Sequence, residues 1–451
     1  MLVLQGCDAP QPDLPLVSID EVSADSVMIW ATSPEPTEIE LVFDADGQRQ
    51  THSLSVDGRA QLRVDGLTSG TQYKVNWRIG KREGGGFSFT TWPLQRRLRI
   101  AFGGDLGGQN ICRDLDHGYP IFDALVKTNP DLFIGLGDLV YADDVCLGDG
   151  ALGNRQVAGE YDIASSATDF IATWAYQYED AALRRFRAQV PWFVTWDDHE
   201  VLNDFSPSRD FRASEPDRRL AAHGMNAMRA FHPLGPGPGY RSFSPSRHAE
   251  VFIIDTRSFR DPNSWPDSAT EPKTLLGDAQ RRWLANSVNN SQATWKLIAT
   301  SVPLAIPVGT AEAGARDGWA NGEDVSGFEQ ELLGLLRNWA DANVRNIIFL
   351  SADVHFATGF RYQPFSDDFV FHEFVVGPLN AGIYPTQNLD QTLQPRRLYF
   401  HGPDPAAVIS FDDAMHWFNA GLIDIDNDGS LVFRLLNAKD EFVETIELTP
   451  R

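Results

Sequence analysis

The chain has 451 residues, of which 42% are hydrophobic, and a formal net charge of -24 at pH 7. This length exceeds one ordinary hydrophobic core, so two domains are expected. The acidic balance excludes a nucleic-acid binder that works by neutralising phosphates, and any site for a phosphate group must supply its own positive charge. No apolar run in the sequence approaches the roughly 20 residues that a membrane-spanning helix needs.

The first residues resemble the end of a bacterial lipoprotein signal, because Leu-Gln-Gly precedes Cys7. Residues 1–13 are therefore interpreted as a leader or tail, in which Cys7 is either lipidated or a free thiol. The lipoprotein interpretation predicts an exported protein, periplasmic or at the cell surface. In that setting Cys112 and Cys146 could pair, whereas in the cytosol all three cysteines would be reduced.

Residues 14–93 are predicted to form a separate all-β sandwich. Short alternating runs at residues 26–31, 38–43, 60–64, 73–77 and 87–91 are separated by turn residues. The run at residues 66–73 resembles the corner before a late strand of fibronectin type III-like domains, with Trp30 as a core residue. The segment has no clustered His, Cys or paired acids, so we do not expect catalysis there.

An α/β pattern begins at residue 98. Residues 119–127 have helical spacing between two strand-like runs, and longer helical patterns follow at residues 165–187, 218–231, 278–289 and 328–342. Residues 419–425 and 430–436 predict a hairpin. Loops interrupt the pattern at residues 143–160, 235–239, 307–323 and 384–413. Long loops in a compact domain tend to be functional or disordered, and those near the strand ends are expected to line a site.

Five strand-like runs in this region end in metal-ligand or phosphate-binding residue types. These endings are Asp105, then Asp138 with Tyr141, then Asp-Asp-His-Glu at residues 197–200, then Asp255 with Arg257, and finally Asp353 with His355. Helix caps and turns alone predict a scatter of Asp, Asn, Ser and Thr instead. Because the ends of parallel strands meet at one edge of a sheet, the set indicates a convergent metal site.

In this order the motifs resemble the calcineurin-like metallophosphoesterases, and more closely their alkaline phosphatase D family, with features of purple acid phosphatases. The superfamily pattern is Asp, Gly-Asp, Gly-Asn-His, a lone His and Gly-His-x-His. It is matched by Asp105, Asp138, residues 197–200 and residues 352–355, while residues 299–303 contain no His for the fourth motif. Over residues 98–451 the resemblance implies a four-layer α/β/β/α sandwich, preceded by the all-β domain. It also implies hydrolysis of phosphate esters by a metal-held hydroxide.

The resemblance further implies ferric iron with one or two calcium ions, with other divalent metals as alternatives. The residues expected around iron are Asp105, Asp138, Tyr141 and His355. Asp105 stands where the family generally has a Cys. A second metal position is predicted at Asp138, Asp198 and Asp353, whose ligands are all oxygen, which suits calcium and disfavours zinc. Asp138 is the expected bridge between the two sides.

Two residues are expected to act on the phosphoryl group. His199 should contact a phosphoryl oxygen or protonate the leaving alkoxide, the alternative being that it holds Asp198 in place. Arg257 should clamp phosphate, because a planar guanidinium matches phosphate oxygens. The alternative for Arg257 is an ion pair with Asp255 or Asp261.

The sequence leaves three functions open. The first is an alkaline phosphatase D-like phosphomonoesterase or phosphodiesterase, and the second is a phospholipase D-like phosphodiesterase. The third is a surface lipoprotein that binds a partner and carries an inactive catalytic domain, which the missing lone His and the absent Cys would favour. Asn203 and Asp204 are either ligands of a further calcium or part of a polar turn.

Overall fold

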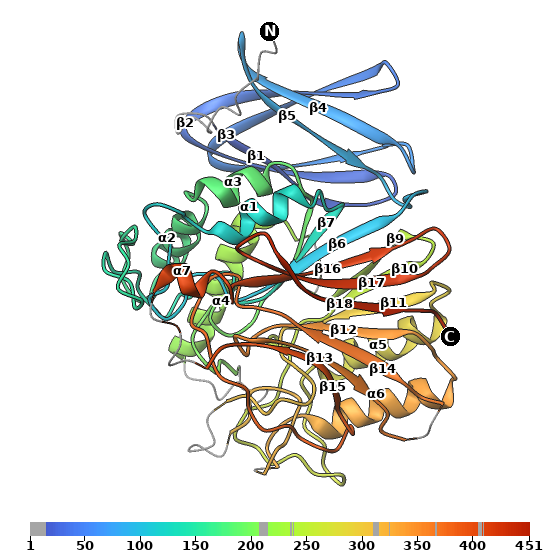
Figure 1. Cartoon of the computed structure of the whole chain (residues 1–451). Coiled ribbons are helices and arrows are strands. Elements are labelled where there is room, and N and C mark those ends of the chain that lie inside the picture. Colours follow the sequence, from blue (N-terminus) through green and yellow to red (C-terminus); the bar gives the residue numbers. More distant parts are fainter. Residues whose placement is uncertain are drawn as a thin grey trace.

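The protein has an all-β sandwich at one end and two large sheets with flanking helices at the other (Figure 1). The computed structural model describes residues 15–206, 215–234, 237, 239–309, 315–323, 325–365, 368–404, 408 and 410–451. The predicted leader at residues 1–13, with Cys7, lies outside the described residues. In the described part, every helix is too short or too polar to cross a membrane.

The sandwich is built largely from two long strands. Its strands are β1 (Leu16–Val22), β2 (Ser26–Ala45), β3 (Gln48–Asp65), β4 (Gln72–Ile79) and β5 (Arg82–Thr90). The pairing of β2 with β3 is irregular between Ser33 and Thr37, where Pro34 and Pro36 lack the backbone N–H that a ladder needs. Before this point β2 pairs with β1, and after it with β4. Each long strand therefore contributes to both layers. The fibronectin type III-like assignment stays a prediction.

The first of the two large sheets has the order β18-β17-β16-β6-β7-β8. Its strands are β6 (Leu98–Gly103), β7 (Leu132–Leu136), β8 (Trp192–Thr195), β16 (Asn419–Ile425), β17 (Leu431–Asn437) and β18 (Phe442–Leu448). The hairpin predicted near the C-terminus is β16 with β17, to which β18 adds a third strand. Because β6, β7 and β8 are parallel, their carboxyl ends meet at one edge.

The second large sheet has the order β15-β13-β14-β12-β11-β10-β9. Its strands are β9 (Arg241–Ser246), β10 (Ala249–Ile253), β11 (Trp295–Ala299), β12 (Ile347–Ser351), β13 (Ala357–Tyr362), β14 (Phe371–Val375) and β15 (Arg396–His401). Here β10, β11 and β12 are parallel neighbours. Across the two sheets, the rings of Phe374 and Phe433 stack with centroids 3.9 Å apart.

Helices cover the outer face of each sheet. They are α1 (Pro120–Lys127), α2 (Ala167–Gln177), α3 (Ala181–Arg187) and α4 (Glu215–Phe231) on the first sheet, α5 (Gly277–Asn290) and α6 (Glu329–Asp341) on the second, and the short α7 (Phe411–Ala414). In β6, Ile100 and Phe102 lie in the core between the sheets, whereas Ala101 packs on the helix side. Both faces are thus buried, which explains the continuous apolar runs. The predicted four-layer α/β/β/α sandwich is confirmed.

The sandwich contacts the four-layer region through buried polar groups. Trp30, predicted as a core residue of the sandwich, is fully buried but donates its indole N–H to the carbonyl oxygen of Ala230 in α4 at 2.7 Å. Arg187 of α3 forms a buried ion pair with Asp20 of β1 at 2.8 Å. The predicted domain boundary at residues 93–98 falls between β5 and β6 and stays a prediction.

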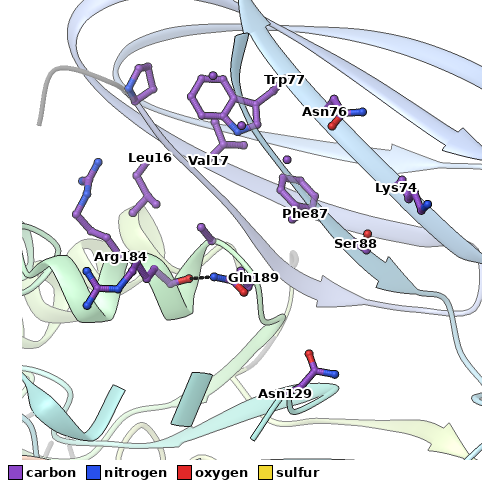
Figure 2. A pocket seen from close by; sticks show the side chains of 16 residues that line it. Leu16, Val17, Lys74, Asn76, Trp77, Phe87, Ser88, Asn129, Arg184 and Gln189 are labelled. Atoms are coloured by element: carbon purple, nitrogen blue, oxygen red, sulfur yellow. Dashed lines mark hydrogen bonds between the residues drawn. The ribbon is translucent and has the colours of Figure 1, made fainter. Parts of the chain in front are cut away.

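A cavity of about 760 Å³ lies between the sandwich and α3 (Figure 2). Trp77 and Phe87 line its sandwich side, and Arg184 and Gln189 line the opposite side. Its lining residues differ from those of the acidic pocket described below. The cavity therefore belongs to the interface between the two parts of the chain.

Candidate metal centre

Several predicted metal ligands follow strands in a strained backbone conformation. The φ angles are 64° at Asp105, 51° at Asp138, 75° at Asp353 and 60° at His355. Left-handed backbone at a non-glycine residue costs about 1–3 kcal/mol and persists only where surrounding structure imposes it. Asp105 follows β6, Asp138 follows β7, and Asp353 follows β12. The sharp turns after these strands bring the three carboxylates together.

The residues predicted around iron are close neighbours. Nε2 of His355 lies 2.9 Å from the hydroxyl of Tyr141 and 4.0 Å from Oδ1 of Asp105. Nδ1 of His355 is 2.7 Å from the carbonyl oxygen of Gly382 and therefore carries the ring proton. Burial lowers the pKa of His355 to about 4, so the ring is neutral near pH 7. Nε2 is then the nitrogen that could bind a cation.

Tyr141 is held by close packing. Its ring centroid is 4.2 Å from that of His199, and a Cβ on Gly108 would lie 2.4 Å from Cζ of the tyrosine. Only glycine therefore fits at residue 108 without a shift of the tyrosine. Burial, together with the charge of Asp138, raises the pKa of Tyr141 well above its usual value. A phenolate here needs a cation beside it.

The carboxylates predicted for the calcium side also converge, together with Asp197. Oxygens of Asp138, Asp197, Asp198 and Asp353 lie within 4.8 Å of one another. Asp105, Asp197, Asp198 and Asp353 each have one buried oxygen without a hydrogen-bond partner in the described residues. Burial and neighbouring carboxylates raise the pKa of Asp105, Asp138 and Asp353 well above the usual range. Cations would pair these oxygens and relieve the repulsion, so the residues fit the metals that the resemblance implies.

Arg257 lies beneath the acidic cluster and is fully buried. Its Nε donates to Asp197 at 2.5 Å, and its two terminal nitrogens donate to Asp317 at 2.8 and 2.5 Å. It also donates to the carbonyl oxygen of Phe205 at 3.1 Å and lies 3.5 Å from Asp198. With its donors occupied in this way, the geometry favours a positioning role for Arg257 over the predicted phosphate contact. The side chain of Arg257 therefore pairs with Asp197 and Asp317 instead of Asp255 or Asp261, the ion-pair partners given as alternatives above.

His199 lines the pocket above the cluster. Its Nδ1 is 2.8 Å from Oδ1 of Asp143, and its backbone N–H donates to Asp138 at 3.2 Å. Burial acts to lower the pKa of His199, but the charge of Asp198 and the hydrogen bond to Asp143 outweigh it and raise the pKa to about 9. A histidine protonated near pH 7 can donate a proton from Nε2.

The structure adds residues that the sequence interpretation did not assign. Glu200 accepts hydrogen bonds from the backbone N–H groups of Asp138, Leu139 and Asp197 at 3.1, 2.9 and 2.8 Å, which fixes the turn after β7. Ser301, in the segment expected to hold the lone His, donates to Asp197 at 2.7 Å. The sequence shows these residues, but only the fold brings Glu200 to Asp138 and Leu139, and Ser301 to Asp197.

A pocket of about 230 Å³ opens over the cluster. Its lining residues are Gln109, Asp138, Asp198, His199, Asn203, Asp204, Val308, Gly309, Asp317, Asp353, Val354, His355, Tyr384 and Gln387. Two of the long loops expected to line a site, residues 307–323 and 384–413, contribute to it. Oxygens of Asp198, Asp204 and Asp317 also lie within 4.8 Å of one another, but Asp317 is already paired with Arg257 and Arg260.

Comparisons with known proteins agree with the motifs. The model of the PhoD-like phosphatase family matches residues 106–428. Alkaline phosphatase D of Bacillus subtilis (strain 168) is 27% identical over 266 residues, which cover 54% of this chain and 44% of that protein, less than half its length. A solved structure titled "Structure of PhoD" aligns with a TM-score of 0.73 and 19% identity, over 100% of this chain and 94% of that one. The chain therefore belongs to the PhoD-like phosphatase family.

Proposed function

We propose that this protein hydrolyses phosphate esters in a metal-dependent reaction. The observation that carries the proposal is the convergence of carboxylates from three strand ends on one pocket, with buried oxygens that lack partners in the described residues. Family membership supports the same reaction class. Bound cations would lower the pKa of a water molecule and neutralise charge on the phosphoryl oxygens.

The side chains of this protein supply the remaining parts of the mechanism. Asp143 orients His199 through Nδ1, which leaves Nε2–H as the proton donor to a leaving oxygen. Arg257 fixes the carboxylate of Asp197 from below and adds positive charge beside Asp198. Tyr384 stacks on His355 with ring centroids 4.7 Å apart and lines the pocket, so it shields the histidine.

The two groups of ligands support different ions. Asp105, Tyr141 and His355 offer carboxylate, phenolate and imidazole, of which the phenolate favours a strongly Lewis-acidic ion such as ferric iron. Asp138, Asp198 and Asp353 offer only oxygen, which suits calcium. We propose iron at the first group and calcium at the second, with Asp138 between them.

The charge of the pocket favours a diester over a monoester. Asp138, Asp198 and Asp353 would be neutralised by the cations they bind. Among the other described lining residues, His199 is cationic and Asp204 is acidic, while Asp317 is paired with Arg257. A phosphodiester carries one negative charge and a monoester carries up to two, so repulsion is weaker for the diester. A phospholipase D-like diesterase is the narrower alternative, and it requires a lipid leaving group.

The test is reconstitution of the purified protein with iron and calcium, followed by hydrolysis of bis-p-nitrophenyl phosphate, p-nitrophenyl phosphate and phosphatidylcholine. We expect turnover of the first two and faster turnover of the diester. Rapid release of choline would favour the phospholipase alternative. Full metal loading without turnover of any substrate would overturn the enzyme proposal and support a binding module with an inactive catalytic domain.

We also propose that the protein is exported. Cys112 and Cys146 form a disulfide, and disulfides persist mainly in oxidising compartments. Lipidation of Cys7 stays a proposal, tested by mass spectrometry of the N-terminal peptide from membrane and soluble fractions. An unmodified Cys7 in both fractions would exclude it.

A further inference from the structure

A disulfide bond links the loops that leave β6 and β7. It joins Cys112 to Cys146, whose Cα atoms are 5.9 Å apart, and both side chains are buried in a small apolar cluster of their own. The first loop begins with Asp105 and runs to Cys112. The second contains Tyr141 and Asp143 before it reaches Cys146. The bond therefore connects two segments that both carry residues of the candidate metal centre.

The first loop positions two residues on the iron side. Gly108 packs directly against the ring of Tyr141. The side-chain oxygen of Gln109 accepts the N–H of Gly382 at 2.9 Å, and the carbonyl oxygen of Gly382 accepts Nδ1–H of His355 at 2.7 Å. A displacement of this loop would thus remove the packing contact of Gly108 with Tyr141 and release the backbone segment that orients His355.

The second loop positions the proposed proton donor. Oδ1 of Asp143 is 2.8 Å from Nδ1 of His199, and Oδ2 of Asp143 accepts the N–H of Asn203 at 2.7 Å. The ring of His199 also lies against Tyr141. The first loop therefore packs on Tyr141 and the second loop binds His199, and the disulfide joins these two loops.

Hydrogen bonds also join the loops. The N–H of Cys112 donates to the side-chain oxygen of Gln156 at 3.0 Å in the interior, whereas the bonds of Asn110 to the second loop are partly exposed to water. The N–H of Asn110 donates to Asp144 at 3.3 Å, and Oδ1 of Asn110 accepts the N–H of Leu147 at 2.9 Å. We propose that the Cys112–Cys146 disulfide is a positioning element of the catalytic site, which fixes Tyr141, His355 and His199 relative to one another. This inference rests on the proposed function, since it assigns those residues their roles.

The test compares the wild type with a Cys112→Ala/Cys146→Ala double variant. In the metal-free proteins we expect faster amide hydrogen exchange at residues 106–112 and 139–147, with the rest of the described chain unchanged. With iron added, affinity should fall about tenfold or more, because groups that orient ligands typically contribute that much. After full metal loading kcat should fall about tenfold, with KM little changed.

A matched control is Val157→Ala, which trims a partly buried residue packed on the cysteine cluster and leaves the bond intact. We expect wild-type iron affinity. An equal loss in this variant would assign the effect to packing and overturn the inference. Wild-type exchange, iron affinity and kcat in the double variant would also overturn it.

Reduction of the folded wild type gives a second route should the double variant not fold. A phosphine and water convert the disulfide to two thiols, and the phosphine becomes its oxide. The same increase in exchange and loss of iron affinity are expected, and unchanged values would contradict the inference. These readouts need no turnover, so an inactive wild type would reject the proposed function alone.

Discussion

Asp198 and Asp353 lie in one acidic cluster, yet their surroundings shift their pKa values in opposite directions. Burial acts to raise the pKa of Asp198, but the charges of Arg257 and His199 outweigh it and lower the pKa. At Asp353, burial and the charge of Asp197 raise the pKa well above its usual value. We call Asp198, with Arg257 and His199, the balanced side, and Asp353, with Asp138, the unbalanced side. Arg257 and His199 therefore favour the ionised form of Asp198, whereas an ionised Asp353 would be stabilised by a bound cation.

The largest effect is expected from Asp138→Asn on the unbalanced side. This change removes the carboxylate common to both predicted ligand groups, so kcat/KM should fall about a thousandfold, equivalent to about 4 kcal/mol of charge stabilisation. Steady-state kinetics and metal analysis check it. Asp131→Asn, just before β7 and paired with Arg96 outside the pocket, is the matched control and should retain activity. Near-normal kinetics in Asp138→Asn would remove Asp138 from the centre.

Arg257→Met breaks the balanced side. Removing one partner of a buried ion pair costs about 3–5 kcal/mol, so the free energy of unfolding should fall by that amount. Denaturant unfolding at pH 7 measures it. Arg49→Met removes an exposed partner of Asp44 and should cost under about 1 kcal/mol. A stable Arg257→Met protein that loses only its inhibition by inorganic phosphate would instead support the predicted phosphate contact.

His199→Gln tests whether the balanced side also supplies a proton. We expect kcat to fall about a hundredfold for a leaving group that needs protonation, such as an alkyl alcohol. The loss should be smaller for p-nitrophenol, which leaves as an anion. Equal losses for both leaving groups would exclude proton donation. Asp143→Asn, which weakens the orientation of Nδ1, should show the same pattern with a smaller loss.

The smallest effect is a pH dependence of stabilisation by calcium. Because the folded pKa values of Asp138 and Asp353 are raised, metal-free protein loses their contribution to stability as pH rises through those values. Calcium binds the ionised forms, so its effect should be larger at pH 8 than at pH 5, reaching about 2.7 kcal/mol at a hundredfold excess over Kd. Thermal unfolding in chelator and in calcium measures it. Equal stabilisation at both pH values would contradict an unbalanced side.

Much of the architecture could be predicted because it depends on local pattern. Strands that are buried on both faces, such as β7, have continuous apolar sequences, and the carboxylates that follow them mark the edge of the sheet. β1 was not predicted. The runs at residues 26–31 and 38–43, predicted as separate, form one long strand, because β2 stays paired with β3 on both sides of its two prolines. Trp30 was predicted to be buried, but its ring partners Tyr178 and Phe231 could not be inferred from nearby residues.

The order of the motifs, the fold class and the residue types offered to a metal follow from the amino-acid sequence alone, because each is encoded within a few neighbouring positions. Which of these groups come into contact depends on how the chain folds. Arg257 was assigned to phosphate from its chemistry, whereas its partner Asp317 comes from a distant loop with no local signal. Likewise the side chain of Glu200, after β8, supports the turn at Asp138 by accepting backbone N–H groups that follow β7. Burial and charge pairing depend on these long-range contacts, so the division of the cluster into balanced and unbalanced sides is a property of the fold.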